Sequence, residues 1–241
     1  MIDVQDLSLS RGRRQVLADV SFTLERGTIT GLLGASGTGK TTLMRAILGL
    51  QRLAGGAISV DGLPAGHRAL RRRIGYVTQS AAVYEDLTAS QNVGYFAALY
   101  GGGRDVVSQA MRTVGLADRG DDLARNLSGG QRNRVSLACA LVGAPEVLIM
   151  DEPTVGLDPL LIDQLWAAFR ELATGGATLL ISSHVMDEAD RCERVLFLRD
   201  GHVIADGSPA ELRQLSGEDD MNNVFIHFAG GPATAGTAAL A

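Results

Sequence analysis

The stretch that decides the fold is TITGLLGASGTGKTT, residues 28–42. It starts with a short apolar run over 28–33, whose length and flanking glycines are typical of a buried parallel strand. A glycine-rich loop follows at 34–39, and the pattern predicts a helix from about 40 to 50. The order strand, glycine-rich loop, helix is the setting in which the pattern G-x-x-x-x-G-K-[ST] binds phosphate.

The residue types in this loop suit phosphate binding for a direct chemical reason. Glycines let backbone N–H groups converge on phosphate oxygens, and the helix N-terminus adds partial positive charge. Lys40, the only lysine of the chain, reaches the β- and γ-phosphates, and the Thr41 hydroxyl binds Mg²⁺. Roughly 0.002 chance matches to the pattern are expected in this composition. The expected phosphate-binding residues are Gly34, Ser36, Gly37, Thr38, Gly39, Lys40, Thr41 and Thr42.

Composition excludes several other classes of protein. The chain has 241 residues, of which 46% are hydrophobic and 20% charged, as in an ordinary globular protein. A net charge of −5 and only 5% aromatic residues argue against nucleic acid as a partner. Two cysteines make no disulfide framework. The N-terminus resembles no signal peptide and no apolar run approaches membrane-span length, so we expect a cytoplasmic location.

Strands alternate with helices along most of the chain, which predicts an α/β fold with a mostly parallel sheet. Residues 4–24 alternate and predict antiparallel strands around a turn at 11–14. Residues 86 to about 143 are helical in pattern and predict an inserted helical subdomain. We therefore expect a P-loop NTPase core with an N-terminal antiparallel β subdomain, over residues 1–228. The Gly-, Ala-, Thr- and Pro-rich tail at 229–241 is predicted to be disordered.

Acidic and polar side chains follow three other predicted strands. Val147–Met150 is an apolar strand followed by Asp151, which suits Mg²⁺, and by Glu152, which suits the base that activates water. Gln79 follows a strand at 74–78 and can contact Mg²⁺ or that water. His184 follows a strand at 178–183, where it can bond the γ-phosphate or the same water.

A second anion-binding helix start is predicted at LSGGQ, residues 127–131. Ser128 is a candidate N-cap for a helix over about 132–141, and Gly129 and Gly130 leave its backbone open to an anion. One mononucleotide needs only one phosphate-binding helix start in each subunit. The second helix start therefore predicts that this segment binds the nucleotide held by a neighbouring copy. A capped helix start with nothing bound is the alternative.

Together these segments resemble the motif set of ABC-type ATPases, over about residues 2 to 215. The set includes the Walker A loop, Gln79, the LSGGQ signature, the Walker B strand, the turn at Gly156–Asp158, and His184. The resemblance implies a head-to-tail homodimer that closes on two ATP molecules. In that dimer Ser128, Gly129, Gly130 and Gln131 of one subunit face the ATP of the other, and Asp158 lies across the interface. Glu152 is then the catalytic base, His184 positions its water, and Thr41, Gln79 and Asp151 hold Mg²⁺.

One position departs from the family pattern. The aromatic residue that usually stacks on adenine is replaced by Arg11. A guanidinium plane also stacks on purines, so we expect weaker base selectivity, with GTP as a possible second substrate.

The segment Tyr84–Val93 and the sequence at 222–225 resemble ABC-2 type exporter subunits. This implies a separate integral-membrane permease as partner, export of a drug, lipid or polysaccharide, and a position on the inner face of the cell membrane. Tyr84 and Leu87 are candidates for the permease contact, with internal packing as the alternative. A soluble ABC ATPase acting on a cytosolic assembly and an importer subunit remain alternatives.

Overall fold

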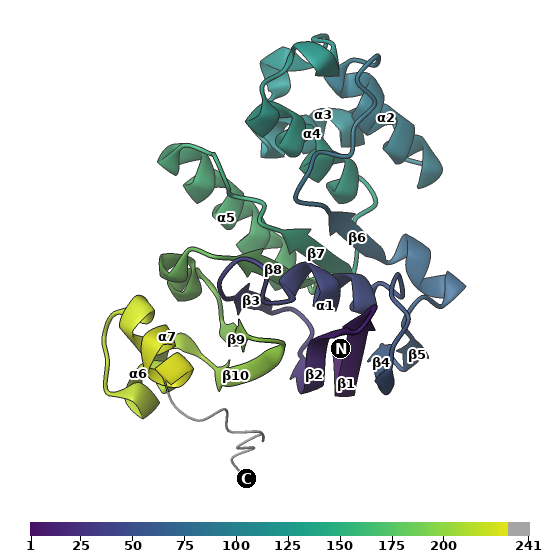
Figure 1. The fold of residues 1–241 in the computed structure, drawn as a ribbon. Coiled ribbons are helices and arrows are strands. Elements are labelled where there is room, and N and C mark those ends of the chain that lie inside the picture. Colours follow the sequence, from purple (N-terminus) through teal and green to yellow (C-terminus); the bar gives the residue numbers. More distant parts are fainter. Residues whose placement is uncertain (231–241) are drawn as a thin grey trace. The chain divides into compact units, whose positions relative to one another are not determined.

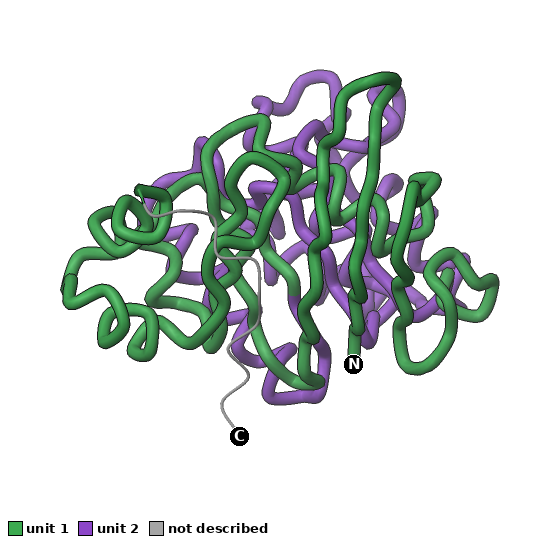
Figure 2. Tube along the Cα trace, turned by 60° about the horizontal axis from the view of Figure 1, so that its bottom comes forward, with its two compact units in different colours: residues 1–71, 180–241 green, residues 72–179 purple. Residues whose placement is uncertain are grey.

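The computed structural model describes residues 1–230. The chain divides into a first unit, residues 1–71 with 180–241, and a second unit, residues 72–179 (Figure 2). The tail predicted to be disordered starts inside a helix that ends at Gly230, and its remainder lies outside the described residues.

An antiparallel sheet of four strands, in the order β2-β1-β4-β5, occupies the N-terminal part of the first unit (Figure 1). Its strands are β1 (Ile2–Arg11), β2 (Arg14–Leu24), β4 (Gly55–Val60) and β5 (Leu63–Pro64). The alternation predicted for residues 4–24 is confirmed, with two slips in phase, one at Asp6 and one at Asp19, which lies between the buried Leu17 and Val20. Val4 and Leu7 are both buried because the pairing register shifts between them, where Asp6 has a φ of 48°.

The phosphate loop begins where β3 (Ile29–Leu33) ends. All five residues of β3 are buried, and β3 runs parallel to β9 (Arg194–Arg199), as the apolar run predicted. β9 pairs antiparallel with β10 (His202–Gly207) around Asp200 and Gly201, both with positive φ. The loop is therefore anchored to a fully buried strand.

Short helices complete the first unit. They are α1 (Lys40–Ile47), η1 (Arg68–Arg72, whose last residue belongs to the second unit), η4 (Met186–Arg191), α6 (Pro209–Ser216) and α7 (Met221–Gly230). The sequence pattern predicts a helix at about 185–192, and the structure has a 3₁₀-helix there, over Met186–Arg191.

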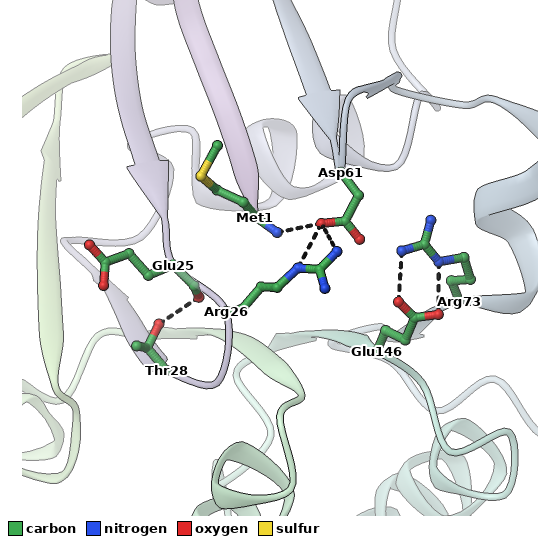
Figure 3. Close-up of polar contacts among 7 residues, drawn as sticks. All are labelled: Met1, Glu25, Arg26, Thr28, Asp61, Arg73 and Glu146. Atoms are coloured by element: carbon green, nitrogen blue, oxygen red, sulfur yellow. Dashed lines mark hydrogen bonds and ion pairs between the residues drawn. The ribbon is translucent and has the colours of Figure 1, made fainter.

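Asp61, directly after β4, fixes the chain start in the first unit. Its Oδ1 accepts hydrogen bonds from the Met1 ammonium group at 2.6 Å and from Arg26 Nε at 3.1 Å (Figure 3). Partial burial raises the pKa of Asp61, but these hydrogen bonds and the two positive charges outweigh it and hold the pKa at about 2.

The second unit combines a parallel strand pair with a group of helices. β6 (Ile74–Val77) runs parallel to β7 (Val147–Asp151), and Arg73 and Glu146 form a two-pronged ion pair beside their first residues (Figure 3). The helices are α2 (Ala89–Leu99), α3 (Arg104–Thr113), η2 (Ala117–Arg119), η3 (Ala124–Asn126), α4 (Gly129–Leu141) and α5 (Pro159–Thr174) (Figure 1). β8 (Thr178–Ser183) begins in this unit and ends in the first.

Candidate nucleotide-binding and hydrolysis site

The phosphate loop of the first unit folds around its own lysine. Lys40 is only 5% exposed, and its Nζ donates to the carbonyl oxygens of Gly34 at 2.6 Å and Ala35 at 3.0 Å. Thr38 Oγ1 also donates to the Ala35 carbonyl, at 2.9 Å. Backbone carbonyl oxygens of the loop therefore hold the Lys40 ammonium group.

This loop fits a triphosphate. A Cβ on Gly34 would lie 2.2 Å from the Leu198 carbonyl oxygen, so only glycine allows this path of the backbone. Gly39 precedes α1 with a φ of 112°, and no side chain caps the helix. The first turn of α1 carries no acidic residue. Its N-terminal N–H groups and positive dipole end are therefore suited to phosphate oxygens.

The second unit joins Gln79 to Glu152. Gln79 Nε2 donates to Glu152 Oε2 at 3.2 Å, so two residues predicted from separate motifs are in direct contact. Gln79 lies two residues beyond the end of β6. Glu152 follows the buried Asp151 and has a φ of 53°, a left-handed conformation that is unfavourable for a residue with a side chain. Strain of this kind is concentrated at functional sites.

The two predicted residues of the first unit outside the phosphate loop, Arg11 and His184, are exposed. Arg11 lies at the end of β1, where it pairs with Arg14 across the hairpin turn. His184 directly follows β8, and the next residue, Val185, is held by a 3.0 Å hydrogen bond from its N–H to Ser183 Oγ. The catalytic roles assigned to Lys40, His184 and Glu152 stay predictions.

The LSGGQ segment forms a capping box at the start of α4. Ser128 Oγ accepts from the Gln131 N–H at 3.2 Å, and Gln131 Oε1 accepts from the Ser128 N–H at 2.8 Å. The predicted N-cap is therefore confirmed. The helix begins at Gly129 rather than at about 132, because the Ser128 cap draws both glycines into its first turn.

Asp158 caps the next helix of the same unit. Its Oδ1 accepts from the Leu161 N–H at 3.0 Å, and Pro159 occupies the first turn of α5. Burial lowers the pKa of Arg134 on α4, and the nearby charges of Asp158 and Asp118 partly oppose that shift. Gly130 lies close to the same turn, since a Cβ there would be 3.6 Å from the Gly156 carbonyl oxygen. The signature helix and the Gly156–Asp158 turn are thus neighbours.

Asn92 is a residue that the sequence did not single out. It is fully buried on α2, and its Oδ1 accepts from the Tyr84 N–H at 2.7 Å. Its Nδ2 donates to the carbonyl oxygens of Tyr84 at 3.0 Å and Thr88 at 2.9 Å. Asn92 therefore fixes the loop that follows Gln79. A polar residue among the apolar positions of α2 was the available signal.

A phosphate loop between a buried parallel strand and a helix defines the class of P-loop nucleoside triphosphatases. Within that class the family follows from comparison with known proteins. Residues 17–155 match the family model described as ABC transporter, and the chain belongs to this family.

Known relatives support the same assignment. The chain is 37% identical to "Nod factor export ATP-binding protein I" of Burkholderia orbicola over 88% of its own length and 72% of the relative. It is 39% identical to "Daunorubicin resistance ATP-binding protein DrrA2" of Streptomyces coeruleorubidus, over 88% and 68% of the two chains. A solved structure titled "Structure of ATP binding subunit of ABC transporter" is 30% identical, with a TM-score of 0.87 and coverage of 95% and 99%. The predicted α/β P-loop fold and the prediction of an exporter-type ATP-hydrolysing subunit are confirmed.

Proposed function

We propose that this chain forms a homodimer that hydrolyses Mg²⁺-bound ATP to drive export through a separate permease, on the inner face of the cell membrane. The relatives named for Nod factor export and daunorubicin resistance support export. The transported molecule is then a drug, a lipid or a polysaccharide. Within residues 1–230 no helix is both long and apolar enough to span a membrane.

The predicted site residues have separate roles in phosphate binding, Mg²⁺ binding and hydrolysis. The Gly34–Thr42 loop holds the phosphates, with Lys40 beside the β- and γ-phosphates. Thr41, Asp151 and Gln79 would hold Mg²⁺, which neutralises charge on the phosphate oxygens when bound. Glu152 takes a proton from the attacking water, and His184 orients that water. The Gln79–Glu152 hydrogen bond supports the role of Glu152 as the base, because it places the side-chain amide of Gln79 beside the Glu152 carboxylate.

The second subunit would complete the site. Ser128, Gly129, Gly130 and Gln131 of one copy would face the γ-phosphate held by the other, and Asp158 would lie across the interface. The capping box leaves the N–H groups of both glycines at the tip of α4, which suits an anion. Closure of the dimer on ATP and reopening after hydrolysis then move the permease.

The observation that carries the permease contact is an exposed aromatic surface in the second unit. Tyr84 and Tyr95 are 49% and 48% exposed, and their rings meet edge to face at 5.6 Å. Leu99, on the same helix as Tyr95, is 53% exposed. Tyr84 lies five residues after Gln79 on the loop held by Asn92. Exposed aromatic rings are the side chains that contribute most at protein interfaces. A partner seated here would touch the loop that follows Gln79.

Recovery of the partner from native membranes tests this proposal. The tagged chain is expressed in its own cell, membranes are solubilised gently, and co-purified proteins are identified and quantified. We expect one multispanning protein in stoichiometric amount. Tyr95→Arg should reduce its recovery, whereas Leu215→Arg, at a 68% exposed apolar position on α6, should not. Recovery with a soluble assembly alone would overturn the proposal and favour the soluble ABC ATPase. An extracytoplasmic solute-binding protein as a further partner would favour import.

A further inference from the structure

One surface of the first unit is positively charged, although the chain as a whole is acidic. The net charge of the chain is −5, yet residues 40–71 contain five basic side chains and a single acid, Asp61. Asp61 already pairs with the Met1 ammonium group and with Arg26, and Lys40 is buried in the phosphate loop. The positive charge that this segment presents to solvent therefore comes from arginines.

Two neighbouring turns bring these arginines to the same part of the unit. The helix α1 packs beside β4 (Figure 1). Gly49, in the turn after α1, meets Gly66, in the turn after β5, so closely that a Cβ on Gly49 would lie 2.3 Å from the Gly66 Cα. Arg52 follows the first of these turns and Arg68 follows the second. Arg52 and Arg68 therefore start from adjacent turns, although they are distant in the sequence.

The helix η1 adds a second arginine beside Arg68. Side chains three residues apart are aligned in a 3₁₀-helix, so Arg68 and Arg71 lie on one face of η1, while Leu70 is its buried residue. Arg52, Arg68 and Arg71 are exposed, and within residues 1–230 none of the three forms a hydrogen bond or an ion pair through its side chain. Their charges are therefore available to a partner.

Leu50 places an apolar side chain next to these charges. It directly follows Gly49 and is 64% exposed. We call Leu50, Arg52, Arg68 and Arg71 the basic patch. A surface that needs only solvation usually mixes acidic and basic side chains. Unpaired guanidinium groups beside an exposed leucine instead suit the boundary of an anionic bilayer, where arginines meet the headgroups and the leucine reaches the acyl chains.

We propose that the basic patch binds acidic phospholipid headgroups and holds the first unit against the membrane surface. The rest of an acidic chain is repelled by such a surface, so the patch also sets which face of the unit approaches it. Each arginine near an anionic surface strengthens binding about fivefold. This inference deepens the proposed position on the inner face of the cell membrane and rests on it, but the binding itself needs neither permease nor nucleotide.

Sedimentation of the purified full chain with lipid vesicles tests this binding. Vesicles of phosphatidylcholine alone are compared with vesicles that also contain phosphatidylglycerol. We expect the chain to sediment only with the anionic vesicles, and to be released as salt approaches about 1 M, where the Debye length is about 3 Å. Arg68→Gln with Arg71→Gln should lower the partition coefficient about 25-fold, with an unchanged melting temperature.

Two further pairs of substitutions serve as controls. Arg104→Gln with Arg112→Gln removes the same charge from exposed positions on α3 of the second unit, and should lower the partition coefficient less than about threefold. Arg68→Lys with Arg71→Lys should retain binding, because the surface potential of a membrane acts on charge rather than on the shape of the guanidinium group.

Three results would overturn the proposal. The first is equal sedimentation with neutral and anionic vesicles. The second is loss of binding in the lysine pair equal to that in the glutamine pair. The third is no vesicle binding by the unsubstituted chain, with less permease recovered by the glutamine pair, which would assign the patch to an acidic protein surface. ATP turnover of the free chain should be the same in all these variants, so failure of vesicle binding leaves the proposed ATPase and permease functions standing.

Discussion

Replacement of Glu152 by glutamine isolates the proposed chemical step. The side chain keeps its length, and its amide oxygen can still accept the hydrogen bond that Gln79 Nε2 donates at 3.2 Å. The backbone at this position is left-handed, with a φ of 53°, and this conformation is equally unfavourable for glutamate and for glutamine. The substitution therefore removes the carboxylate base with little change in structure.

The expected loss of ATP turnover follows from the role of Glu152 as a general base. A positioned general base contributes about 10²- to 10⁴-fold to a rate, which corresponds to about 3 to 5 kcal/mol of the barrier. Glu152→Gln should lower ATP turnover by that factor while the Kd for ATP changes less than twofold. With hydrolysis blocked, ATP should hold the chain as a dimer.

Phosphate release at saturating Mg²⁺ and ATP measures turnover, and size-exclusion chromatography with light scattering measures the dimer. Glu85→Gln is the matched control, because Glu85 is an exposed acid of the same unit and should leave turnover unchanged. Turnover of Glu152→Gln within threefold of the unsubstituted chain would refute the assignment of Glu152 as the base.

Other perturbations test other parts of the structure. Gly34→Ala should abolish nucleotide binding in calorimetry, because its Cβ would lie 2.2 Å from the Leu198 carbonyl oxygen; retained affinity would show that the loop tolerates another path. Asp61 has a folded pKa of about 2, below its usual 3.8, so its stabilisation is present above pH 3.8 and is lost as the pH falls toward 2. Asp61→Asn should lower the unfolding free energy at pH 7 by about 1 to 2 kcal/mol, after screening of its exposed partners, and denaturant titrations should converge with the unsubstituted chain near pH 2. Asn92→Ala should cost about 2 to 4 kcal/mol, because it leaves buried backbone groups of the Tyr84–Thr88 loop without partners, and an unchanged melting temperature would contradict that role.

Local sequence patterns predicted the parts of the fold that depend on neighbours in the chain. The buried run at 29–33 and the Ser128 cap both follow from residue type and spacing, and the structure contains each of them. The Walker and signature motifs are equally local, so the amino-acid sequence alone was sufficient to predict the family.

Contacts between distant segments could not be predicted in this way. Nothing in the spacing indicates that Phe225 on α7 packs edge to face on Phe197 of β9. The role of Asn92 was also hidden, because a single polar residue in a helix does not identify the backbone groups that it satisfies.

The most direct test of ATP-driven work on a membrane permease compares turnover by the purified chain with turnover by the complex isolated from membranes, at equal subunit concentration. We expect the complex to hydrolyse ATP at a rate set by its permease, with Glu152→Gln abolishing it and Tyr95→Arg returning it to that of the free chain. Equal rates in both preparations, unaffected by Tyr95→Arg, would contradict the coupling of this ATPase to a permease.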